Sequence, residues 1–438
     1  MSVGEAEGRP LGPRLQRYAL ADRRAPSPGA VHGCRVCARA ASPSSMDVFV
    51  ADGPAVLRCQ VPWGESSEEA GGRPMGGGGP GADAGKDDLL LPEGSRTDAG
   101  IPCSAWEPFS GGRAEVQHLS LSRCGKYLGA VDARGRAAIV DANALVSGGD
   151  VVGGGGIVRL QAGPGASAEG ATLEPGWGGL AFDQVGPSGH APASALVRHW
   201  QRTLDLFDHE ARHVRRMHGA GSPLAAAWLS GVAAGCVATT EGHHLVLWDP
   251  RVAEGGGVVR RIVSPTTAPL WTLAASEGRV CVGTGDRRVL SYDPRSWAVA
   301  HTLNSVLKND VTGLALPADD APGGGLYAAG VDPEVVAHGA IAPTGTHSGA
   351  KRSRRRDESR GADQGATPPI GHEPSPPRPV SFRGEGRSLG LALATLSPRL
   401  GPRAGDVVLN YSASGAIHVL SLPPHNPYSA LRRMRQSS

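Results

Sequence analysis

Two related tetrapeptides, Trp248-Asp249-Pro250-Arg251 and Tyr292-Asp293-Pro294-Arg295, constrain the fold of this chain more than any other feature of its sequence. Each ends the same local pattern of small residues, a short turn, an apolar run, an aromatic residue and an aspartate. Their spacing of about 40–45 residues lies in the range at which self-similarity indicates a repeat architecture. Each copy is then one structural unit that buries its apolar face only against its neighbours.

Strand and turn signals of the same kind recur along most of the chain. Residues 116–121, 126–131 and 136–140 alternate with two short turns, which predicts three strands of one blade without its outer strand. We therefore expect an all-β β-propeller of four-stranded blades, with seven blades favoured and six or eight as alternatives. Further repeats of this pattern cover residues 179–208, 225–249, 271–293, 311–330 and 389–420.

A separate hairpin is predicted at residues 47–61, where two apolar strands flank the turn Asp52-Gly53. We expect this hairpin to supply strands of the seventh blade and to close the ring with the C-terminal repeat. Closure would leave no sheet edge exposed, and exposed edges invite aggregation.

Two segments carry a resemblance to a known family. The run Ser122-Arg123-Cys124-Gly125-Lys126-Tyr127-Leu128 and the pair Trp248-Asp249 resemble the WD-repeat (transducin-like) family. The resemblance implies a propeller that works as a scaffold, since members serve complex assembly, RNA processing, transport and ubiquitin ligation. In that family a Gly-His pair opens each repeat, and its His forms a polar network with a turn Asp. Here His218-Gly219 and His243 are poor substitutes, so we expect packing to hold the repeats. The resemblance covers residues 46–62, 113–342 and 380–423.

Composition divides the chain into one large domain with long insertions, since 64 glycines and 36 prolines concentrate between the apolar runs. Ordered sequence begins abruptly at Met46, which suggests that Met46 is the true or an alternative start. The rival hypothesis is an organelle-targeting presequence, because arginines outnumber acids before it. The expected divisions are a disordered N-terminus at 1–45, a propeller at 46–423 with insertions at 63–112, 146–176 and 343–380, and a C-terminal tail at 424–438.

Charge and cysteine usage indicate the compartment and the partners. A net charge of +3 creates no global field that would attract nucleic acid or anionic lipid. The seven cysteines are scattered, and Cys124, Cys236 and Cys281 fall in or beside predicted strands, which favours a reducing compartment. The uncharged run at 222–240 is better explained by two strands than by a membrane span. We expect an intracellular protein of the nucleus or cytoplasm, with proteins as partners and without membrane, nucleic-acid or small-molecule ligands.

Four residues are candidate partner-binding anchors. Arg251 and Arg295 follow the two blade ends, and aromatic-Asp-x-Arg endings resemble the box by which WD propellers dock on the adaptor of cullin-4 ubiquitin ligases. Arginine and tryptophan carry much of the binding energy at protein interfaces, which adds Trp200 and Trp271 to the candidates. The alternative roles are a solvated side chain for each arginine and packing between blades for each tryptophan. We expect Asp249 and Asp293 themselves to be acceptors within turns.

The sharpest charge cluster lies in a predicted loop. Five cations in six residues fit a nuclear-localisation or nucleic-acid-binding signal, and the alternative is a solvated loop. No aromatic residues alternate with these cations, which disfavours recognition of single strands by stacking. The cluster consists of Lys351, Arg352, Arg354, Arg355 and Arg356.

No motif in the sequence predicts a reaction. The pair Cys34 and Cys37 lacks the further ligands of a structural zinc site, and the segment 81–86 lacks the hydroxyl residue of a phosphate loop. We therefore nominate no catalytic, cofactor-binding or metal-binding residue. The favoured function is a non-enzymatic WD-repeat scaffold in a multiprotein complex. The alternatives are a substrate receptor of a cullin-4-type ubiquitin ligase and, from another class, a propeller enzyme with a polar cluster in its channel.

Overall fold

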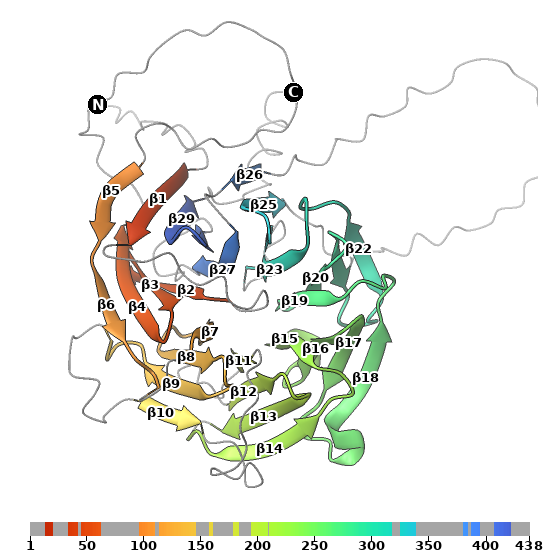
Figure 1. The fold of residues 1–438 in the computed structure, drawn as a ribbon. Coiled ribbons are helices and arrows are strands. Elements are labelled where there is room, and N and C mark those ends of the chain that lie inside the picture. The colour runs from red at the N-terminus through yellow and green to blue at the C-terminus, as the bar shows by residue number, and fades with distance from the viewer. Residues whose placement is uncertain are drawn as a thin grey trace, which may run out of the picture.

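The protein is a closed ring of seven β-sheets around a common axis, as a computed structural model shows (Figure 1). Within the residues that the structure describes, the sheets are formed by 29 strands, and two short 3₁₀ helices, η2 (Gly231–Ala233) and η3 (Glu254–Gly257), lie in connections. None of the helices in the described part of the chain is long and apolar enough to cross a membrane. The structure describes residues 14–20, 34–42, 45–62, 96–109, 114–145, 157–160, 178–183, 194–208, 210–317, 325–338, 380–383, 387–394 and 407–421.

Six of the sheets are four-stranded blades, numbered here in chain order, and each places its first strand nearest the axis. Blade 1 consists of β2 (Val36–Ser42), β3 (Ser45–Asp52), β4 (Ala55–Pro62) and β6 (Cys103–Trp106). Blade 2 consists of β7 (Val116–Leu121), β8 (Tyr127–Asp132), β9 (Ala137–Asp141) and β10 (Ile157–Leu160). Blade 3 consists of β11 (Gly178–Phe182), β12 (Ser194–His199), β13 (Thr203–Asp208) and β14 (His213–His218).

The ring continues through three further blades and then closes. Blade 4 consists of β15 (Pro223–Trp228), β16 (Val237–Glu241), β17 (His244–Trp248) and β18 (Val258–Val263). Blade 5 consists of β19 (Leu270–Ala275), β20 (Val280–Thr284), β21 (Val289–Tyr292) and β22 (Val299–Leu303). Blade 6 consists of β23 (Val311–Ala315), β24 (Leu326–Gly330), β25 (Glu334–His338) and β26 (Val380–Arg383). Blade 7 consists of β27 (Ser388–Ala394), β28 (Val407–Ser412), β29 (Ala416–Ser421), β1 (Arg14–Leu20) and β5 (Arg96–Ile101). The predicted all-β propeller with seven blades is confirmed.

Ring closure differs from the sequence-based expectation. The hairpin at 47–61 does not join the C-terminal repeat; it forms β3 and β4 of a complete blade 1. Closure is made by β1, which pairs antiparallel with β29 and parallel with β5 (Figure 1). The expectation of a disordered segment at 1–45 is therefore wrong for β1 and β2. β1 could not be recognised from a local pattern because its partner β29 lies far along the chain, whereas β2 pairs with the adjacent β3.

Two predicted insertions also contain strands. The segment 63–112 includes β5 and β6, and the segment 146–176 includes β10, so those parts of the expectation are wrong. These are outer or added strands, and outer strands carry few buried apolar residues that a sequence pattern could reveal. Residues 339–379, which hold nearly all of the third insertion and the basic cluster, lie outside the described residues, as does the tail at 424–438.

The tetrapeptides that first indicated the repeat lie at equivalent points of blades 4 and 5. Trp248 and Tyr292 are fully buried, and Trp248 Nε1 donates to Thr239 Oγ1 over 2.8 Å. Asp249 and Asp293 each accept a hydrogen bond from the backbone N–H two residues on, at 3.0 Å. This confirms that the two carboxylates are turn acceptors.

The apolar core is divided into seven clusters, and each cluster fills the space between two adjacent blades. Between blades 4 and 5, for example, Leu245 and Leu247 pack with Leu273 and Tyr292. Between blades 7 and 1, Tyr18 of the closing strand packs with residues of both blades. Blades with weak repeat signals are therefore held by the same inter-blade packing as the regular blades, as the sequence suggested.

Buried carboxylates paired with arginines add a polar element to the first four blades. Asp205 has the most side-chain partners among them: it is 0% exposed and contacts Arg216, His199 and His213. The other pairs are Asp47 with Arg39 and Arg58, Asp132 with Arg136, and Glu241 with Arg261.

Candidate functional site

The inner strands of all seven blades line a channel along the ring axis. It is occupied by two adjoining cavities of about 120 and 370 Å³. Seven aliphatic residues, one from each inner strand, lie at one level of the channel. In every blade this residue pairs with the same position of the second strand, two residues before that strand ends. These side chains are largely buried, for example Val36 at 0% and Leu119 at 2% exposure, because they also pack in the clusters between blades. These seven residues are Val36, Leu119, Leu180, Ala226, Leu273, Leu314 and Leu391.

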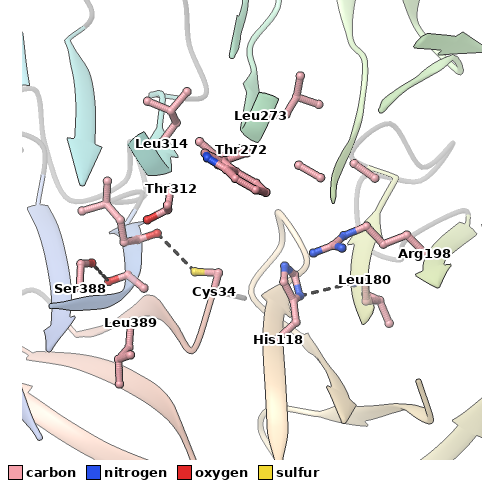
Figure 2. A pocket seen from close by; sticks show the side chains of 16 residues that line it. Cys34, His118, Leu180, Arg198, Thr272, Leu273, Thr312, Leu314, Ser388 and Leu389 are labelled. Carbon is pink, nitrogen blue, oxygen red and sulfur yellow. Dashed lines mark hydrogen bonds between the residues drawn. The ribbon is translucent and has the colours of Figure 1, made fainter. Parts of the chain in front are cut away.

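One buried cation lies in the wall of the smaller cavity, where Figure 2 shows Arg198 beside His118. Arg198 belongs to β12 and is 3% exposed, and its Nη1 donates to the Pro223 carbonyl over 3.2 Å. Gly179 of the neighbouring strand makes room for it, because a Cβ there would lie 2.4 Å from Arg198 Nε. A glycine in the inner strand thus allows a guanidinium to reach the channel.

Burial sets the charge of both groups. Desolvation first, and then the charge of Arg198, lowers the pKa of His118 to about 3, so His118 is neutral at pH 7. Desolvation lowers the pKa of Arg198 to about 10, which leaves the guanidinium cationic at pH 7. His118 Nδ1 accepts a hydrogen bond from the Leu180 N–H at 3.4 Å. The smaller cavity therefore has one buried positive charge in its wall, and Arg39 and Arg123 line the larger cavity.

Cys34 also lines the channel, between β2 and β27 (Figure 2). Its thiol lies 3.2 Å from the Val36 carbonyl and 3.4 Å from the Leu391 carbonyl. Burial raises its pKa, and the pKa of Cys37 is raised well above the usual value by burial and by Cys34. Thiols of this kind carry little thiolate at pH 7 and are weak nucleophiles. Within the described ranges no three His, Cys, Asp or Glu residues are placed to hold a metal ion.

Arg251 and Arg295 lie on one face of the ring, because each follows the third strand of its blade. Arg251 is 70% exposed, and its Nε and Nη2 each donate to Asp249 over 2.8 Å. This hydrogen bonding lowers the pKa of Asp249. Arg295 is exposed on the next blade, and its backbone N–H donates a hydrogen bond to Asp293 Oδ1. The two arginines thus project from equivalent positions of adjacent blades.

Trp200 and Trp271 lie towards the opposite face, so the four predicted anchors do not form a single site. Trp200 is in the turn between β12 and β13 and is 38% exposed. Trp271 is half-buried at the cavity, and its Nε1 donates to Asp310 Oδ2 over 2.9 Å. Trp271 therefore links blade 5 to the connection before blade 6, in partial agreement with the alternative of packing between blades.

Sequence reasoning missed Arg198 and His118. One signal was present: a charged residue, Arg198, interrupts the apolar strand at 194–199, and two glycines stand in the partner strand at 178–179. The pairing that sets Arg198 opposite Gly179 depends on register, which the sequence pattern did not give. Nothing in the local sequence of β7 marks His118 as a channel residue.

Comparisons with known proteins identify the fold. No family model matches the sequence, and no curated protein matches it. Solved structures do match, among them a chain in the crystal structure of the mitotic checkpoint complex, with a TM-score of 0.57. The match covers 96% of this chain and 95% of that chain at 10% sequence identity. At this identity the likeness shows the fold alone.

Proposed function

We propose that this protein is a non-enzymatic WD-repeat scaffold that holds other proteins together in a multiprotein complex. The observation that carries the proposal is a closed ring that presents exposed anchors on two opposite faces. Trp200 projects from one face, and Arg251 and Arg295 project from the other. The similar chain in the mitotic checkpoint complex supports it as a propeller that belongs to an assembly.

The ring suits this role because its anchors stand on fixed supports. Arg251 leaves the end of β17, and the strand beside it, β16, is buried along its whole length. A side chain on such a support loses little backbone freedom on binding, and aromatic and arginine anchors supply most of the energy at protein interfaces. Anchors on both faces allow two partners to bind at once.

The scaffold proposal is tested by quantitative affinity purification of the full-length protein from cells of its source. We expect a reproducible set of co-purifying proteins, part of which is lost with Trp200→Ala and another part with Arg251→Ala combined with Arg295→Ala. Arg159→Ala on the exposed outer strand β10 is the matched control and should retain both parts. Recovery of no protein above the background of an untagged strain would overturn the proposal.

A second candidate function is a substrate receptor of a cullin-4-type ubiquitin ligase. It is favoured by Arg251 and Arg295, which repeat on adjacent blades and remain exposed, with one guanidinium oriented by its own aspartate. We expect the purified cullin-4 adaptor to bind the full-length protein, and the double alanine variant to lose at least tenfold in affinity. Arg159→Ala should bind as the wild type does. Absence of wild-type binding to the adaptor ends this candidate and leaves the scaffold proposal standing.

We further propose that Lys351, Arg352, Arg354, Arg355 and Arg356 direct part of the protein to the nucleus. Support comes from the charge density of the sequence alone. A fluorescent fusion with these five residues changed to alanine should become cytoplasmic, whereas a fusion with Arg134→Ala, in a turn of blade 2, should keep the wild-type distribution. An unchanged nuclear fraction in the five-residue variant would contradict the proposal.

A further inference from the structure

Two cysteine thiols face each other across blade 1. Cys59 on β4 and Cys103 on β6 are directly opposite in the antiparallel register, and their Sγ atoms are 3.0 Å apart. Both residues are thiols in this structure. Cys59 is buried and Cys103 is half-buried, so a small oxidant can reach the pair through Cys103. Opposed residues of an antiparallel pair have the Cβ spacing from which a disulfide can form with a small adjustment.

The pair lies at the seam where the ring closes. Only Pro102 separates β6 from β5, and β5 extends blade 7 beside the closing strand β1. The segment 96–106 therefore contributes one strand to blade 7 and the next strand to blade 1 (Figure 1). A covalent bond from Cys103 to β4 would fix this segment on the blade 1 side.

We propose that Cys59 and Cys103 form a reversible disulfide that fastens the segment 96–106 across the seam between blades 7 and 1. The oxidant is a peroxide, for which hydrogen peroxide is the probe. The Cys103 thiolate attacks the peroxide O–O bond, becomes a sulfenic acid and releases one water after protonation. The Cys59 sulfur then displaces the sulfenic oxygen as a second water, and an S–S bond forms. In total two thiols lose two protons and two electrons, and peroxide becomes two waters.

The assignment rests on geometry that the other cysteines lack. Cys124 is exposed in a turn, and its Sγ lies 3.3 Å from the Ser122 hydroxyl. Cys281 is buried in the core between blades 5 and 6. Cys124 is therefore the internal control for general oxidation, because it is accessible to peroxide and stands apart from the opposed pair.

Peptide mapping under non-reducing conditions tests the proposal on the full-length protein. Trypsin separates the two cysteines into residues 59–86 and 97–113, each with a single cysteine. After treatment with hydrogen peroxide we expect these peptides to be joined, and dithiothreitol to release them. Cys103→Ser and Cys59→Ala should each abolish the joined peptide, whereas Cys124→Ser should retain it.

Thermal unfolding provides an independent readout. A disulfide that closes this loop restricts the unfolded chain, and oxidised wild type should melt about 5 °C above the reduced form. Cys103→Ser and Cys59→Ala should show no such rise after the same treatment, although each reduced variant must first show a cooperative transition. The proposal is overturned if Cys124 is oxidised while no joined peptide forms, or if Cys103 links to another cysteine instead.

Discussion

Replacing Arg216 by methionine is expected to lower the free energy of unfolding by about 3–5 kcal/mol, because it leaves the Asp205 carboxylate buried without its main partner. Arg216 Nε and Nη2 lie 2.7 and 2.9 Å from the two carboxylate oxygens, a bidentate pair. His199 and His213 remain as weaker contacts at 3.1 and 3.2 Å, which places the expected loss near the lower limit.

Removal of Arg216 should cost more stability than removal of Asp205. Asp205 is fully buried, whereas the Arg216 side chain is 28% exposed and can turn towards water when its partner is removed. Adding Asp205→Leu to Arg216→Met removes the stranded charge and should recover at least half of the lost stability, since an apolar replacement of both partners is tolerated better than the loss of one.

Urea denaturation at pH 7, followed by tryptophan fluorescence, measures these differences. Arg251→Met is the matched control: its ion pair with Asp249 is exposed, so the expected change is below about 1 kcal/mol. The reasoning is refuted if Arg216→Met stays within about 1 kcal/mol of the wild type, or if the double variant is less stable than Arg216→Met alone.

Three further predictions follow from the fold. Deletion of residues 1–24 removes β1 and uncovers the edge of β29, so the protein should melt at a lower temperature and aggregate in light scattering, whereas deletion of residues 1–13 should change neither. Burial raises the pKa of Asp205, but hydrogen bonds from Arg216 and His199 outweigh it and hold the pKa below its usual range. The stabilisation by this carboxylate is therefore complete above the unfolded pKa of about 3.9 and is lost as pH falls, so the stability difference between wild type and Asp205→Asn should shrink below about pH 4 in urea titrations. Trp248→Ala should cost about 3–5 kcal/mol in urea denaturation and Trp200→Ala less than about 0.5 kcal/mol, because only the first side chain is in the core.

The sequence allowed the blades to be predicted where their signals are local. In blades 4 and 5, the second and third strands are buried along nearly their whole length and end at short turns, and the aromatic residue before Asp249 or Asp293 is a core residue. The closing strand β1 could not be predicted in this way. Its partner β29 lies far along the chain. Arg14 and Arg17 also interrupt the apolar residues of β1, so the strand shows no clear apolar alternation of its own.

The site was predictable only in part for the same reason. Arg251 and Arg295 were found because they follow a local motif, and the alternation of strand direction sets them on one face. Arg198 reaches the channel through a register that brings it opposite Gly179, and His118 lies beside it from another blade. Such juxtapositions depend on pairing and on inter-blade packing, which a pattern within one segment does not contain.

The pairing of β1 with β29 also determines the order in which the molecule can be completed during synthesis. β1 leaves the ribosome about 400 residues before its antiparallel partner, a delay of roughly 20–80 s at ordinary elongation rates. For that time the nascent chain can stack successive blades on one another, but its first strand has no place to dock. The last blade therefore forms only after β29 has emerged, and until then the unfinished ring exposes a strand edge that chaperones of the nascent chain would have to shield.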